Sequence, residues 1–259
     1  MTLKKSIVAL FLFLLVFSSC TKEENQIPGV TPPNSTLNEG LLVHLPFSNN
    51  LNDASGNGIN GSSEGVLNYS RNRYFDDAKA LTFNGTNNFV QIPEQKIVGL
   101  QKFSFYVEFM PFTSAAQCLI GKRTYDPATT NPLSQSFNIL INYAGTGVRF
   151  TLRKSGQCNS ELLSAYHTPL TSGSEQVMLN CWNNVAGTFD GSVQKLYVNG
   201  KLVAEQTLSG VEMCAGDPVR VGVWWKNEPL LFSGKFDEVR IYNRAITLEE
   251  VKELYKLSN

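Results

Sequence analysis

The stretch Phe103-Ser104-Phe105-Tyr106-Val107-Glu108-Phe109-Met110 places a large apolar side chain at every second position of residues 103–110. Because successive side chains of a β-strand point to opposite faces of a sheet, this pattern predicts a strand with one buried face. The same period of two recurs at residues 137–143, 148–153 and 219–224. Alternation of this kind is typical of antiparallel sheets that have one face on the core.

Turn-forming dipeptides separate these stretches. Glycine and asparagine tolerate the positive φ that tight reversals need, and they stand together at Gly56-Asn57-Gly58, Asn84-Gly85, Asp190-Gly191 and Asn199-Gly200. We therefore expect roughly a dozen short strands in an all-β fold, a two-sheet antiparallel jelly-roll sandwich. A short C-terminal helix is expected to follow, because Thr247-Leu248-Glu249-Glu250 forms a capping box ahead of an apolar stripe.

The charge balance excludes one class of partner. Lysine plus arginine and aspartate plus glutamate both total 22, so the net charge is 0, and no basic tract is present. Nucleic-acid binding needs clustered positive charge, so we expect no nucleic-acid partner. The two histidines, His44 and His167, are too few to supply the three or four protein ligands of a zinc site.

The N-terminus has the pattern of an export signal. Lys4 and Lys5 precede an apolar run over residues 7–17. This run is too short for a membrane-spanning helix, which needs about 20 apolar residues. We predict a signal peptide at residues 1–19 and, from its Pro, Gly and Ser content, a flexible tether at 20–39. The folded domain is expected at 40–259.

Phe17-Ser18-Ser19-Cys20 resembles a bacterial lipobox, which implies that Cys20 is acylated and becomes the first residue of the mature protein. Residues 21–25 resemble the export signal of surface lipoproteins of the Bacteroides group. The two resemblances imply a protein anchored in the outer membrane and exposed at the cell surface. The alternative for Cys20 is an ordinary secretory signal with an incidental cysteine.

Four cysteines remain for the folded part, at Cys118, Cys158, Cys181 and Cys214. Exported compartments are oxidising, so up to two disulfides are expected, in any of three pairings. Free buried thiols are the alternative.

Several stretches, taken in chain order, resemble the laminin-G-like and concanavalin A-like lectin/glucanase jelly roll. They are Leu45-Pro46-Phe47, Asp53-Ala54-Ser55-Gly56-Asn57-Gly58, Trp182-Asn183-Asn184-Val185-Ala186-Gly187-Thr188-Phe189-Asp190-Gly191, Lys195-Leu196-Tyr197-Val198-Asn199-Gly200-Lys201 and Gly234-Lys235-Phe236-Asp237-Glu238-Val239-Arg240-Ile241-Tyr242. The resemblance covers residues 40–259 and implies this fold. The fold hosts lectins, glycosidases and adhesion modules, so the site residues must decide the function.

Glucanases of this fold hold two carboxylates about 5 Å apart on one face of one strand, which requires acidic residues two positions apart. Outside the C-terminal helix no such spacing occurs, because Asp76 and Asp77 are adjacent, as are Asp237 and Glu238. We therefore expect no enzyme. A glycoside hydrolase whose carboxylates converge from distant strands stays open.

The predicted ligand site comprises Trp224, Arg123, Tyr125 and Arg149, since aromatic rings stack on sugar rings and polar groups bind hydroxyls. Trp224 is expected to face outward, opposite to Trp225, if the strand continues through both. These residues favour a non-catalytic, lectin-like carbohydrate-binding lipoprotein that captures polysaccharide or host glycan beside neighbouring glycan-uptake proteins. Its alternatives are the hydrolase and a protein-binding adhesion or scaffold module.

A structural Ca²⁺ is expected between Asp53 and Asp237. The loop around Asp53 offers a carboxylate among bent carbonyls, and Asp237 shares strand parity with Val239 and Ile241, which face the core. A buried charge there calls for a cation. In the family resemblance, aspartates at these positions often hold calcium. The alternative is that both carboxylates accept hydrogen bonds from the protein.

Overall fold

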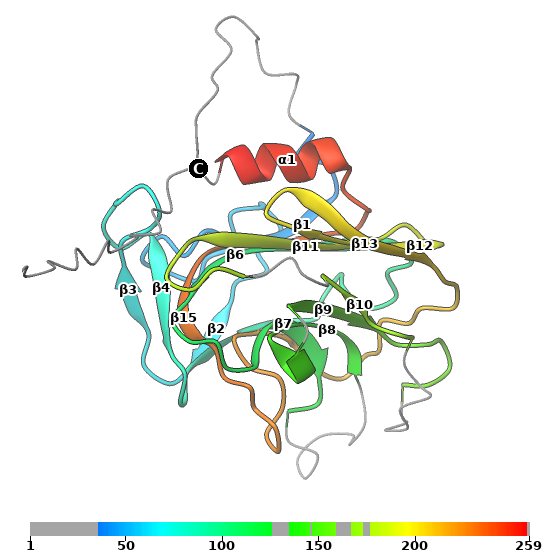
Figure 1. Cartoon of the computed structure of the whole chain (residues 1–259), viewed down its shortest axis with the longest axis horizontal. Helices are drawn as coiled ribbons and strands as arrows, with labels where there is room; N and C mark the ends of the chain where they lie inside the picture. The colour runs from blue at the N-terminus through cyan, green and yellow to red at the C-terminus, as the bar shows by residue number, and fades with distance from the viewer. Residues whose placement is uncertain (1–35, 126–134, 146, 159–166, 173–176, 258–259) are drawn as a thin grey trace, which may run out of the picture. The chain divides into compact units, whose positions relative to one another are not determined.

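The computed structural model describes residues 36–125, 135–145, 147–158, 167–172 and 177–257. Within these ranges the chain forms two antiparallel sheets packed face to face and one α-helix, α1 (Leu248–Leu257) (Figure 1). The expected all-β jelly-roll sandwich with a short C-terminal helix is therefore confirmed. No helix in the described part is long and apolar enough to cross a membrane.

The first sheet has eight strands. Its order is β13-β12-β11-β6-β15-β4-β3, and β1 pairs with β15 outside this path. The strands are β1 (Leu41–Leu45), β3 (Asn68–Ser70), β4 (Ala80–Asn84), β6 (Phe103–Pro111), β11 (Asn183–Phe189), β12 (Val193–Val198), β13 (Lys201–Thr207) and β15 (Ser233–Tyr242).

The second sheet has seven strands in the order β10-β9-β8-β7-β14-β5-β2. They are β2 (Ser62–Glu64), β5 (Phe89–Ile92), β7 (Gln117–Arg123), β8 (Gln135–Ile141), β9 (Val148–Leu152), β10 (Leu170–Thr171) and β14 (Val219–Val221). A single 3-10 turn, η1 (Tyr143–Gly145), follows β8.

The core lies between the sheets. Phe105 of β6 stacks on Phe137 of β8 with ring centroids 3.8 Å apart, and both side chains are fully buried. The alternate side chains of β6 point to the other face of the first sheet, where Tyr106 packs with Leu254 of α1. The predicted period of two in β6 thus separates an inner core from a second apolar cluster that includes residues of α1. The helix lies over the outer face of the first sheet (Figure 1).

The helix begins as its sequence predicts. The Glu250 backbone N–H donates to Thr247 Oγ1 at 3.2 Å, and the Thr247 N–H donates to Glu250 Oε2 at 2.7 Å. These reciprocal bonds form the capping box. Ahead of the first strand, Leu37 is buried beside the same helix and Arg244 donates to the Thr36 carbonyl at 2.9 Å. The packed part of the chain therefore includes residues 36–39, which the sequence placed in the tether.

The cysteines are partly assigned. Cys158 and Cys214 form a disulfide, and Cys118 is a buried free thiol. The predicted signal peptide, Cys20 and the tether through residue 35 lie outside the described residues.

Candidate functional site

Five side chains form a continuous series beside the second sheet, named here the aromatic–arginine ladder: Arg149, Tyr143, Trp224, Arg123 and Trp225. Arg123 ends β7, Tyr143 lies in η1, Arg149 lies in β9, and both tryptophans follow β14. All five side chains are half-buried. The structure thus brings together three of the four predicted ligand residues.

The members of the ladder contact one another through ring faces and edges. The Arg149 guanidinium lies over the Tyr143 ring at 5.2 Å, and that ring meets Trp224 edge to face at 5.8 Å. The Arg123 guanidinium lies 5.1 Å from the Trp224 ring and 4.1 Å from the Trp225 ring. Cation–π contacts of this kind contribute about 0.5–2 kcal/mol each. They hold the aromatic rings in fixed orientations.

Gly222 explains why both tryptophans join the ladder. Its φ of +85° would strain any residue with a side chain, and a Cβ there would lie 2.6 Å from the Phe83 ring. β14 therefore stops at Val221, and the chain reverses so that the Trp224 N–H donates to the Pro229 carbonyl at 2.8 Å. The strand does not continue through Trp224 and Trp225, so the condition under which the two side chains would face opposite sides is not met.

Glu228 and the indole groups give the ladder its polar character. Burial and the charge and hydrogen bond of Glu228 raise the pKa of Tyr143, against the opposing effects of Arg149 and Arg123. The phenol therefore stays protonated at neutral pH. The indole N–H groups of Trp224 and Trp225 are shielded and have no hydrogen-bond acceptor among the described residues.

Tyr125 is placed differently from the other predicted ligand residues. Its ring packs against Phe89, with centroids 5.2 Å apart, and the Arg220 guanidinium lies over it at 5.2 Å. The ring is partly buried against the core. The Tyr125 carbonyl accepts the N–H of Lys226, the residue after Trp225, at 2.8 Å.

Sequence reasoning missed Tyr143, Trp225 and Glu228 as members of this site. Tyr143 continued the apolar alternation of residues 137–143, which assigned it to the core side of a strand. In the structure β8 ends at Ile141, and Asn142 and Ala144 adopt positive φ of 55° and 53°. The Asn142 and Gly145 residues next to Tyr143 were the available signal for a turn.

A second polar cluster lies on the outer face of the first sheet. Arg73 forms ion pairs with Glu108 of β6 and, at 3.5 Å, with Asp237 of β15. Glu238, the next residue, pairs with His44 at 3.0 Å and with Arg240. Carboxylates from two strands therefore converge, which acidic spacing within one strand could not reveal.

A β-bulge sets the position of Asp237. The register between β15 and β6 shifts between Phe236 and Glu238, and Phe236 and Val239 both lie in the core although they are three positions apart. Because of this extra residue, the side chain of Asp237 does not point to the same face of the sheet as that of Val239. The expectation that Asp237 faces the core with Val239 and Ile241 is therefore wrong.

The carboxylates of this cluster differ in acidity. Burial raises the pKa of Asp237 to about 6, although Arg73 opposes it. Burial also acts to raise the pKa of Glu238, but the His44 hydrogen bond and the Arg240 charge hold it at about 2. Separated pKa values are typical of acid–base pairs. However, the Glu108 side chain is only 1% exposed and Arg73 lies against it, so a polysaccharide cannot reach this carboxylate in the observed arrangement.

Comparisons with known proteins define the family. Residues 84–252 match the family model described as the concanavalin A-like lectin/glucanases superfamily, type Laminin_G_3. The chain belongs to the concanavalin A-like lectin/glucanase superfamily. No curated protein matches its sequence.

Solved structures share the fold of this superfamily member at low sequence identity. Domain 4 of the arabinanase AbnA from Geobacillus stearothermophilus, solved with arabinotriose, has a TM-score of 0.63 and 21% identity over 83% of this chain and 98% of that one. The binding domain of botulinum neurotoxin DC, solved with SialylT, has a TM-score of 0.61 and 14% identity over 86% of this chain. The match covers 52% of the neurotoxin chain, about half its length.

The predicted calcium ligands have protein partners in this superfamily member. Asp53 Oδ1 accepts the N–H groups of His44 and Ser55, both at 2.9 Å. Its Oδ2 accepts the Ser55 hydroxyl at 2.8 Å and the Ile59 N–H at 3.0 Å. These bonds use about four lone-pair positions, all that a carboxylate offers. Asp53 as placed therefore does not fit a calcium ligand, and Asp237 faces the Arg73 cation. The contacts of both carboxylates therefore argue against the expected calcium site, which a metal-binding experiment has still to test.

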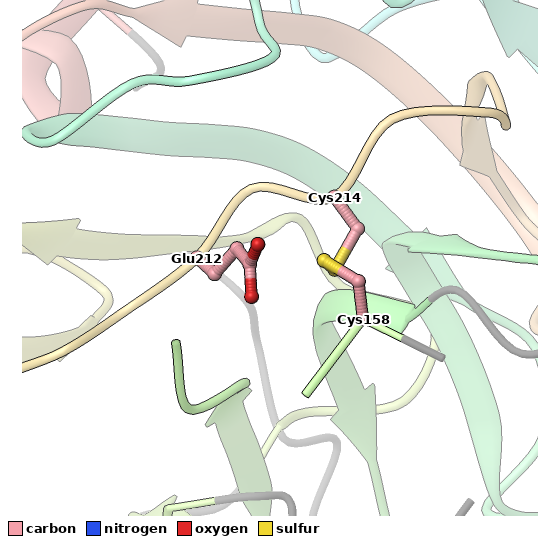
Figure 2. Close-up of side chains that lie close together, drawn as sticks. All are labelled: Cys158, Glu212 and Cys214. Carbon is pink, nitrogen blue, oxygen red and sulfur yellow. A yellow bond between two sulfur atoms is a disulfide. The ribbon is translucent and has the colours of Figure 1, made fainter. Parts of the chain in front are cut away.

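One further group of metal-binding residue types occurs in the described ranges, at Cys158, Glu212 and Cys214 (Figure 2). The two sulfur atoms are bonded to each other, and metal ligation needs thiolates. The Glu212 carboxylate accepts the Gly156 N–H at 2.7 Å. The group stabilises two loops beside a cavity of about 450 Å³ and does not fit a metal centre while the disulfide is intact.

Proposed function

We propose that this chain is a non-catalytic carbohydrate-binding protein and that the aromatic–arginine ladder is its binding surface. The ladder itself carries the proposal. A pyranose ring presents an apolar face of C–H bonds that stacks on tyrosine or tryptophan, while its hydroxyls exchange hydrogen bonds with charged and amide groups. Tyr143 and Trp224 supply rings, and Arg123, Arg149 and Glu228 supply polar groups beside them.

The comparisons support the proposal at the level of fold. The superfamily includes lectins, and two proteins of similar fold were solved with an arabinotriose or with SialylT. A shared fold does not carry a ligand from one protein to another, so the ladder residues remain the decisive argument.

The cellular setting belongs to the same proposal. A lipid on Cys20 holds the protein in the outer membrane, and residues 21–35 connect that anchor to the domain. Placed at the cell surface, the ladder captures polysaccharide or host glycan for neighbouring uptake proteins.

A glycan array combined with a reducing-sugar release assay tests the proposal with the purified protein. Binding without release is the expected result. Release of reducing sugar would instead favour a hydrolase, and Glu108→Gln would then show whether the buried carboxylates take part. Absence of both binding and release would favour a protein-binding scaffold.

A further inference from the structure

The ladder carries more positive than negative charge. Two guanidinium groups lie over its rings: Arg123 of β7 contacts Trp224 and Trp225, and Arg149 of β9 contacts Tyr143. Glu228 is the carboxylate that acts on Tyr143, and the phenol hydrogen-bonds to it. Among the described residues of this site, one carboxylate therefore accompanies two guanidinium groups, a balance that favours an anionic ligand at the rings.

Arg149 differs from the described arginines that form an ion pair with a carboxylate. Five arginines have a carboxylate within 4.0 Å: Arg71, Arg73, Arg220, Arg240 and Arg244. The Arg149 guanidinium has no carboxylate oxygen within that distance among the described residues. Its contacts are the Tyr143 ring at 5.2 Å and a bond from Nε to Thr151 Oγ1 at 3.3 Å. The two terminal nitrogens of Arg149 are thus left to donate to a ligand.

Arg149 is also fixed in place, which distinguishes it from a freely moving surface side chain. It lies within β9, where its backbone pairs with Leu140 of β8 and Thr171 of β10. Its guanidinium carbon lies over the Tyr143 ring, 5.2 Å from the ring centroid. A guanidinium held in this way presents a planar fork of N–H donors that matches a carboxylate, and less side-chain entropy is lost when the two bind.

We propose that the ladder selects acidic glycans, with Arg149 binding the carboxylate of a uronic or sialic acid residue. Tyr143 and Trp224 stack on the sugar ring, and the terminal nitrogens of Arg149 donate two hydrogen bonds to the carboxylate. Arg123 adds positive charge from the next step of the ladder. This inference rests on the proposed carbohydrate-binding function and names the ligand class of the same site.

The test compares acidic oligosaccharides with their carboxyl-reduced counterparts, which keep the ring and lose only the charge. Oligogalacturonate, oligoalginate and sialyllactose are titrated into the purified protein by calorimetry, each beside its reduced form. We expect at least one acidic ligand to bind about 10- to 100-fold tighter than its reduced form, the range for hydrogen bonds to a charged group. Added salt should reduce this difference in affinity between the acidic and the reduced ligand, because it screens the charges.

Arg149→Gln should abolish the preference for the acidic form over the reduced form, while Arg149→Lys should retain part of that preference. Arg71→Gln is the matched control, because Arg71 is an exposed arginine paired with Asp77. Melting curves establish that each variant is folded.

The outcomes separate the two proposals. Equal or tighter binding of the reduced sugars, or an acidic preference that survives Arg149→Gln, would overturn the acidic-glycan inference and leave carbohydrate binding standing. Failure to bind any member of either set, together with a glycan array without hits, would overturn the carbohydrate-binding proposal and this inference with it.

Discussion

Replacing Asp237 by Asn tests whether the charge cluster on the first sheet holds a carboxyl group of altered acidity. Burial raises the pKa of Asp237 from 3.8 to about 6 in the folded protein. The stability that this group contributes is fully present below pH 3.8 and is lost as the pH rises through about 6. The gap between the two pKa values corresponds to about 3 kcal/mol of unfolding free energy.

Asn has nearly the size of Asp but does not titrate, so the variant does not lose unfolding free energy as residue 237 ionises. We expect the unfolding free energy of Asp237→Asn, minus that of the parent protein, to rise by up to about 3 kcal/mol between pH 4 and pH 7. Urea denaturation at half-unit pH steps measures this difference. Glu238 and Glu250, whose pKa values are lowered to about 2, titrate below this pH range and add no step to the difference.

Asp77→Asn is the matched control, because the Asp77 side chain is 81% exposed and its difference curve should stay flat. Parallel pH profiles for the parent and Asp237→Asn would refute the reasoning. They would show that Asp237 has an ordinary acidity, and they would remove it as a candidate acid for any hydrolase.

Three further predictions concern the turn, the metal and the anchor. Gly222→Ala should destabilise the fold by about 2–4 kcal/mol in urea denaturation, because positive φ strains alanine and its Cβ meets Phe83; an unchanged midpoint would contradict this. Because hydrogen bonds occupy Asp53 and an arginine faces Asp237, millimolar Ca²⁺ and EDTA should both leave the melting temperature unchanged, whereas a rise with Ca²⁺ would establish a calcium site. Cys20→Ser should move the protein from the membrane to the soluble fraction, and retention in the membrane would remove the proposed lipid anchor.

Much of the fold could be predicted because its signals are local. The alternation over residues 103–110 reflects the geometry of β6 itself, and the Thr247 capping box closes within one helical turn. Such signals need no knowledge of which segments meet in space. Two sheets with one helix therefore followed from pattern and turn chemistry.

The errors arose where one residue changes the backbone path. A positive φ at Gly222 ends β14, and a bulge at Asp237 shifts the parity of β15. A period of two cannot detect either event, because the surrounding residues still alternate. The parity arguments for Trp225 and Asp237 failed for this reason.

The membership of the two polar clusters depends on strand pairing. Glu108 meets Glu238 because β6 and β15 are neighbours in register, although the two residues are far apart in the chain. Tyr143 and Trp224 likewise come from opposite sides of β7 in the second sheet. Single-sequence patterns do not contain that register, so composition could suggest the residue types but not their grouping.

Titration of a bound glycan against ladder variants tests the central claim most directly. Trp224→Ala and Tyr143→Ala should each weaken binding by about 1–3 kcal/mol, which corresponds to about 5- to 150-fold in the dissociation constant. Phe112→Ala should leave the dissociation constant unchanged, because Phe112 is 42% exposed and lies outside the ladder. Unchanged affinity in both folded ladder variants would contradict the account and place the glycan elsewhere on the protein.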